Sequence, residues 1–89
     1  MELNILRSQI NEIDEKLIDL LNKRLKIALH IGKIKTEQKL PVFNETREKE
    51  VLDFVKTKNT GPLKEDQVET IFQMIMEICR NAQHQSRKD

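Results

Sequence analysis

The first forty residues of the chain repeat apolar side chains at a regular spacing. Between Leu3 and Gln38 the sequence contains no proline and only one glycine. Apolar residues recur there in alternating steps of three and four, which places them on one face of a helix. These positions are Leu3, Leu6, Ile10, Ile13, Leu17, Leu20, Ile27, Ile31 and Ile34, with the charged Arg24 in the same series. The pattern therefore predicts one very long helix over residues 3–38.

Such a helix is too long for its own domain. At 1.5 Å per residue it extends about 54 Å, whereas a compact chain of this length has a diameter of roughly 30 Å. Much of its apolar face would then have no partner in the same chain. A second copy of the chain is the simplest cover, and we therefore expect an intertwined helical homodimer.

Two shorter helices are predicted after the first. Pro41 disfavours helical geometry at the preceding residue, so a short connection should follow the first helix. Asn44 is a good N-cap for a second helix that ends near residue 59. Residues 59–62 (Asn-Thr-Gly-Pro) indicate a turn, and the third helix then carries on its apolar side Val68, Ile71, Phe72, Ile75, Ile78, Cys79 and Ala82. The polar residues 84–89 are expected to fray or to begin a linker.

Composition narrows the classes of fold and function. Hydrophobic residues make up 37% of the chain and charged residues 35%, which is polar for a globular protein but sufficient for a core. An all-α fold in a single domain of residues 1–89 is expected. The formal net charge of +1 and the presence of only three aromatic residues argue against nucleic acid as a partner.

The cysteine count and the lengths of the apolar runs indicate the cellular compartment in which the protein is expected. The single Cys79 excludes an internal disulfide and a cysteine-rich metal site, which suits a reducing environment. No apolar run approaches the roughly 18 residues of a membrane-spanning helix, and the N-terminus lacks the pattern of a secretory signal peptide. We expect a cytoplasmic protein without a membrane partner.

Arg24 interrupts the apolar face of the first helix and is the most informative residue of the pattern. It is either a structural residue, which forms a salt bridge or sets the register of a coiled coil, or an anion-binding residue. Spacing alone favours the structural interpretation. Lys35 lies eleven residues later on the same face, about 16 Å along the axis, so the two long side chains could hold one small dianion. The alternative for Lys35 is a solvated charge.

Other polar residues could complete such a site. Arg47 and Glu48 stand in the first turn of the second helix, and Gln83 shares a face of the third helix with Cys79. Each also has an ordinary structural interpretation. Arg47 and Glu48 could form a surface ion pair, Gln83 could make a polar contact near the end of the chain, and Cys79 could be a small buried residue.

No metal or cofactor site is predicted. His30 and His84 have no neighbours at a characteristic metal-ligand spacing. Two glycines and two histidines in these positions cannot supply a phosphate-binding loop or a catalytic triad. What remains is a set of Arg, Lys, Gln and Glu side chains, which suits a reaction that positions an anion and stabilises developing charge.

Three groups of residues along the chain carry a family resemblance. They are Leu6-Arg7, Ile10, Ile13-Asp14, Leu17, Leu20-Leu21, Arg24, Ile31-Gly32-Lys33 and Lys35; then Pro41-Val42 and Arg47-Glu48; then Phe72, Ile75, Cys79 and Gln83. In their joint order and spacing, over nearly the whole chain, these groups resemble the all-helical class of chorismate mutases. The resemblance implies an intertwined dimer with two equivalent sites that convert chorismate to prephenate, an isomerase reaction of phenylalanine and tyrosine biosynthesis. The site residues that it implies are Arg7, Arg24, Lys35, Arg47, Glu48, Cys79 and Gln83.

The same resemblance implies a role for each main side chain. Arg7 and Arg24 would meet the two substrate carboxylates, Lys35 and Gln83 would donate to the ether oxygen, and Glu48 would accept from the ring hydroxyl. Arg24, Lys35 and Gln83 would thus be the catalytic residues. Arg7 lies 28 residues before Lys35, about 42 Å along one helix. We therefore expect Arg7 of one subunit to serve the site of its partner in an antiparallel dimer.

Two positions depart from the family pattern, and some alternatives stay open. Asn44 stands where relatives often carry Asp, and Cys79 stands at a Ser-like position. The alternatives are an isochorismate-pyruvate lyase of the same fold and a non-catalytic helical dimerisation or regulatory module. The sequence also fits the mutase portion of a longer shikimate-pathway enzyme.

Overall fold

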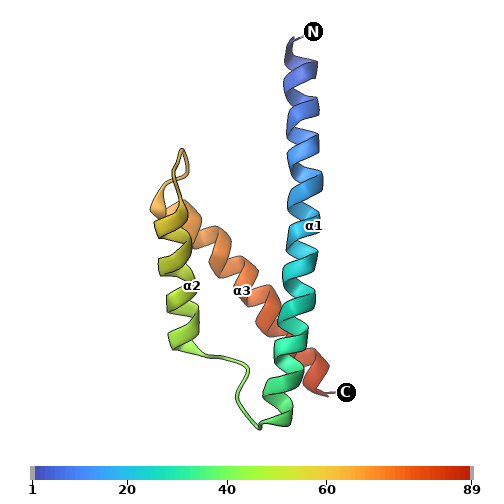
Figure 1. Ribbon diagram of the computed structural model, residues 1–89, viewed down its shortest axis with the longest axis vertical. Coiled ribbons are helices and arrows are strands. Elements are labelled where there is room, and N and C mark those ends of the chain that lie inside the picture. The colour runs from blue at the N-terminus through green and yellow to red at the C-terminus, as the bar shows by residue number, and fades with distance from the viewer. Residues whose placement is uncertain (1, 89) are drawn as a thin grey trace.

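The computed structural model describes residues 2–88, which form three α-helices and no strand (Figure 1). The helices are α1 (Glu2–Glu37), α2 (Glu45–Lys58) and α3 (Glu65–Lys88). The all-α class and the very long first helix expected from the sequence are confirmed. Each end of α1 lies one residue from its predicted position.

α3 is the helix that joins the other two, because it packs against both α1 and α2. In Figure 1 it runs diagonally from the end of α2 to the C-terminal part of α1, where the two helices cross. The buried apolar side chains are few, and most belong to α3: Val42, Val68, Met76 and Cys79. The small core of one chain therefore follows α3.

The N-terminal half of α1 packs against neither of the other two helices, and Figure 1 shows it standing clear of α2 and α3. Its apolar positions are between 49% and 60% exposed: Leu3, Leu6, Ile10, Ile13, Leu17 and Leu20. The molecule measures 56 × 27 × 15 Å, with a radius of gyration of 16.2 Å, against about 12 Å for a compact chain of this length. The apolar face that was predicted to need a cover is uncovered in a single chain.

The C-terminal end of α1 is a Schellman motif without glycine. The backbone N–H of Lys39 donates to the Thr36 carbonyl at 3.1 Å, and the N–H of Leu40 donates to the Lys35 carbonyl at 2.8 Å. Lys39 has φ +59°, in the left-handed region that this motif requires and that glycine adopts most readily. The motif ends α1, and the chain then continues into the connection to α2.

The boundaries of the shorter helices match the expected caps, with one difference. The Asn44 side chain accepts a hydrogen bond from the Arg47 backbone N–H at 3.0 Å, as an N-cap does. The tail that was predicted to fray from residue 84 is instead helical as far as Lys88. Arg87 explains this difference, because it donates to Thr36 Oγ1 at 3.0 Å and to the Leu40 carbonyl at 2.5 Å. Asp89 lies outside the described residues.

None of the helices in the described part of the chain is long and apolar enough to cross a bilayer.

Candidate active site

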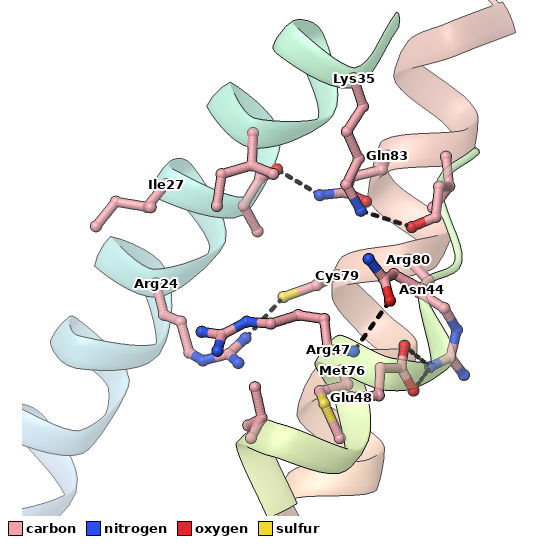
Figure 2. Close-up of a pocket in the computed structure, with 14 residues that line it drawn as sticks. Arg24, Ile27, Lys35, Asn44, Arg47, Glu48, Met76, Cys79, Arg80 and Gln83 are labelled. Carbon is pink, nitrogen blue, oxygen red and sulfur yellow. Dashed lines mark hydrogen bonds and ion pairs between the residues drawn. The ribbon is translucent and has the colours of Figure 1, made fainter. Parts of the chain in front are cut away.

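A pocket of about 260 Å³ lies where the C-terminal half of α1, the start of α2 and the C-terminal half of α3 meet. Basic side chains reach toward it from all three helices, as Figure 2 shows. Four basic residues line it, Arg24, Lys35, Arg47 and Arg80, together with a single acidic residue, Glu48. A pocket with this surplus of positive charge suits a small anion with more than one negative group.

Arg24 enters the pocket from the middle of α1. Its Nη1 atom donates to the Cys79 sulfur on α3 over 3.4 Å. None of the ion pairs within residues 2–87 includes Arg24, so the salt bridge of the structural interpretation does not form among these residues. A thiol is a weak acceptor, and the guanidinium therefore keeps most of its hydrogen-bonding capacity for another partner.

Lys35 enters the pocket from the last turn of α1. The residue is half-buried, and its ammonium group donates to the Val42 carbonyl at 2.9 Å. An ammonium group carries three donors, so this bond orients the side chain and leaves protons for a group in the pocket. Val42 is itself 4% exposed, which makes the anchor of this lysine one of the most buried points of the chain.

Gln83 enters from α3 and is the one buried polar side chain among the described residues, at 8% exposure. Its Nε2 atom donates to the Ala28 carbonyl at 2.5 Å. Because a carbonyl oxygen only accepts, the amide nitrogen must face α1. One of the two Nε2 protons makes this bond, and the second stays available to the pocket.

Gly32 makes this arrangement of Gln83 possible. It is the one buried residue of α1, and a Cβ atom built there would lie 2.8 Å from Cγ of Gln83. Any side chain at this position would therefore push Gln83 away from the Ala28 carbonyl. The glycine of the Ile31-Gly32-Lys33 motif serves the close approach of α1 and α3.

Glu48 has a partner that the sequence analysis did not single out. Nη1 of Arg80 lies 2.6 Å from Oε1 and 2.5 Å from Oε2 of Glu48, so one donor group binds both carboxylate oxygens. Arg80 directly follows Cys79 and precedes Gln83 by three residues, a spacing that shares a helix face. That spacing was the signal that could have identified it.

The other residue of the predicted pair, Arg47, is more exposed. It forms a 3.8 Å ion pair with Glu50, and both side chains are more than 60% exposed. Such a pair contributes little to stability, so Arg47 is free to turn toward the pocket that it lines.

The structure thus brings six of the seven predicted site residues to one pocket and leaves Arg7 outside it. The six are Arg24, Lys35, Arg47, Glu48, Cys79 and Gln83. Arg7 precedes Arg24 by 17 residues, about 26 Å along α1, in the half of the helix that stands clear of the chain. Residues 2–87 contain no group of three or more His, Cys, Asp or Glu side chains that could hold a metal ion.

Comparison with known proteins gives a consistent result. The model of the family described as chorismate mutase type II matches residues 6–84. The chain is 36% identical over 83 residues to a bifunctional chorismate mutase/prephenate dehydratase from Pseudomonas aeruginosa, a match that covers 88% of this chain. It covers 23% of that relative, so the chain spans about a quarter of the length of the curated relative.

Solved structures share the fold over almost their full length. A chorismate mutase from Helicobacter pylori, solved in complex with prephenate, is 33% identical with a TM-score of 0.89, over 98% of this chain and 94% of that one. A chorismate mutase from Thermus thermophilus has a TM-score of 0.92 at 24% identity, over 94% of this chain and 96% of that one. At 24% identity the match to the Thermus thermophilus structure supports the fold alone.

Proposed function

The chain belongs to the type II chorismate mutase family, and from this membership we propose that it rearranges chorismate to prephenate in phenylalanine and tyrosine biosynthesis. The observation that carries the proposal is a pocket in which four basic residues and a buried, oriented amide surround a space of about 260 Å³. Such a site can bind the carboxylates of a dianion through its positive groups and can place hydrogen-bond donors at the reacting atoms.

The chemistry needs no more than such a site provides. In the rearrangement the ether carbon–oxygen bond breaks while a carbon–carbon bond forms, and all atoms stay in one molecule. No nucleophile, proton transfer or cofactor takes part. Holding the flexible enolpyruvyl arm near its reactive geometry supplies an entropic gain, and donors at the ether oxygen stabilise the negative charge that grows there.

We assign the reacting end of the substrate to Lys35 and Gln83. Both side chains already use one donor to fix their position, on the Val42 carbonyl and the Ala28 carbonyl respectively. Their remaining protons would meet the ether oxygen. Because the protein makes the anchoring bonds before substrate arrives, little reorganisation is needed at the moment of reaction.

The other side chains would bind the ends of the substrate. Arg24 has no carboxylate partner among residues 2–87 and would bind one substrate carboxylate, with Arg47 beside it framing the pocket. Glu48 would accept a hydrogen bond from the ring hydroxyl. The second carboxylate would be met by Arg7 of a partner subunit.

We also propose the homodimer that this assignment requires. A single chain exposes 7648 Å², whereas a folded monomer of 10.5 kDa exposes about 5,400 Å². The excess of roughly 2,200 Å² is far above the ~800 Å² that each partner buries in a standard interface. Antiparallel pairing of two α1 helices would cover the apolar face and carry Arg7 to the second pocket. The cytoplasmic location expected from the sequence stays a prediction.

The direct test is the loss of chorismate absorbance over time with purified protein, together with identification of prephenate as the product. Saturable conversion is expected, and light scattering should give twice the chain mass. Release of pyruvate from isochorismate at a comparable rate would favour the lyase alternative. Absence of saturable turnover with either substrate would favour a non-catalytic module.

A further inference from the structure

Arg80 is the one basic residue of the pocket that already has a carboxylate partner within the pocket. Its Nη1 atom binds both oxygens of Glu48, at 2.6 Å and 2.5 Å, and the two side chains are 30% and 23% exposed. On its other side the guanidinium lies over the Phe43 ring, 5.5 Å from the ring centre. Arg80 is thus held between a carboxylate from α2 and an aromatic ring from the preceding connection, a geometry in which both contacts attract.

The pair has a consequence for how charge is distributed in the pocket. Glu48 is the only acidic residue among the pocket-lining residues, and Arg24, Lys35 and Arg47 line the same space. An unpartnered carboxylate on a flexible side chain would turn toward these cations, because opposite charges a few ångströms apart attract strongly where water is partly excluded. It would then compete with a dianionic ligand for them. The bond to Arg80 prevents this and leaves the other cations free.

The bond also fixes the direction of Glu48. One donor shared by both oxygens holds the carboxylate in a single orientation, and each oxygen keeps a further lone pair for a second donor. Figure 2 shows the two dashed contacts from Arg80 to the Glu48 carboxylate. A hydroxyl group that approaches from the pocket therefore meets an acceptor that is already placed.

We propose that Arg80 is a positioning residue: it orients Glu48 toward the substrate hydroxyl and keeps this carboxylate away from the cations that bind the substrate carboxylates. This rests on the proposed function, in which Glu48 accepts from the ring hydroxyl of chorismate. Arg80 itself makes no contact with the substrate in this arrangement. Its effect on the reaction passes entirely through Glu48.

A second ion pair between the same helices provides the control. Lys56 and Glu69 join α2 and α3 with a separation of 3.2 Å and side-chain exposures of 27% and 38%, close to those of the Arg80 pair, but neither residue lines the pocket. If Arg80 only tied α2 to α3, Lys56→Met would have the same effect on activity as Arg80→Met.

The test is a double-mutant cycle on kcat/KM for chorismate with Arg80→Met, Glu48→Gln and the combined variant. Arg80→Met is expected to lower kcat/KM about tenfold in the wild-type background and less than about twofold in the Glu48→Gln background. Much of the loss should be a raised KM, since a released Glu48 competes with the substrate. Arg80→Lys, which keeps a positively charged donor group for the Glu48 carboxylate, should recover part of the activity, and Lys56→Met should match the wild type. For any variant too slow to assay, the same cycle is measured on the affinity for prephenate, by calorimetry.

The outcomes separate this inference from the function on which it rests. An equal loss on Arg80→Met with and without the Glu48 carboxylate would show that Arg80 acts independently of Glu48, and would overturn the inference. Equal losses of kcat/KM in Arg80→Met and Lys56→Met, with parallel drops in melting temperature, would show that Arg80 only holds α2 against α3, and would overturn the inference. If the wild-type protein does not turn over chorismate, the proposed function itself is overturned. The wild-type assay therefore comes before any variant is made.

Discussion

Gly32→Ala is expected to remove most of the activity from a protein that stays folded. The added Cβ atom would lie 2.8 Å from Cγ of Gln83 and 3.3 Å from its Cβ and Cδ atoms. Carbon atoms in contact sit about 3.5–4.0 Å apart, so the side chain of Gln83 must move by about 1 Å. Its amide would then leave the Ala28 carbonyl, and the donor proposed for the ether oxygen would leave its place.

Opposing terms set the size of the stability change at Gly32. Alanine is favoured over glycine within a helix by about 1 kcal/mol. Overpacking costs about 1–3 kcal/mol, and loss of the amide hydrogen bond costs about 1 kcal/mol. The net loss of about 1–3 kcal/mol leaves a protein of ordinary stability, about 5–15 kcal/mol, mostly folded. A 1 Å error at a positioned group, by contrast, costs on the order of 100-fold in rate.

The assay compares kcat/KM with the free energy of unfolding in the same buffer. Gly61→Ala is the matched control, because Gly61 has φ +81° with nothing within 4 Å of a built Cβ atom. Alanine there is strained by about 1–2 kcal/mol but lies far from the pocket, so it should lose stability and keep its activity. Wild-type kcat/KM in folded Gly32→Ala protein would refute the reasoning, because the position of the Gln83 amide would then be unimportant to the reaction.

Three further predictions follow from the same geometry. In Gln83→Glu, burial and the Ala28 carbonyl oxygen should raise the pKa of the new carboxyl group above about 4.3. Because a carboxyl group donates a hydrogen bond only when it is protonated, kcat/KM of this variant should fall as pH rises from about 4.5 to 8. The wild-type profile should stay nearly flat over the same range. Arg7→Ala and Arg24→Ala chains should each be severely impaired, yet mixing them should restore activity, because one site of the heterodimer contains only wild-type groups; no rescue after verified subunit exchange would contradict the shared site. Lys39→Gly should raise the free energy of unfolding by about 1 kcal/mol by relieving the left-handed backbone, whereas Lys39→Ala should be neutral by the same denaturant titration.

The parts of the fold that depend on residues close together in the chain could be predicted from the sequence. α1 follows from an unbroken three-and-four spacing of apolar residues without proline, and the start of α2 follows from the capping side chain of Asn44. These features depend on neighbours within one or two helical turns. The motif that ends α1 was not predicted, because its left-handed residue is Lys39 and not the glycine that usually marks such a motif.

The candidate site was predictable only where a residue breaks a pattern or matches a family motif. Arg24 is conspicuous on an apolar face, but Arg80 stands among the polar residues of α3, and its partner Glu48 lies 32 residues away in the chain. The role of Gly32 likewise depends on the distance between two helices, which no local pattern contains. Such residues become interpretable once the crossing of α1 and α3 is known.

The uncovered half of α1 also determines the order in which the proposed dimer can assemble. Synthesis proceeds from the N-terminus, so the apolar face over residues 3–20 leaves the ribosome before α2 and α3, yet neither of these helices covers it. In the proposed dimer this face would be made before the other two helices but buried after them, when a second chain arrives. Completion of the fold would then be a bimolecular step whose rate rises with the concentration of newly made chains. Until that encounter each new chain would expose an apolar helix face, so rapid pairing of neighbouring nascent chains would limit aggregation.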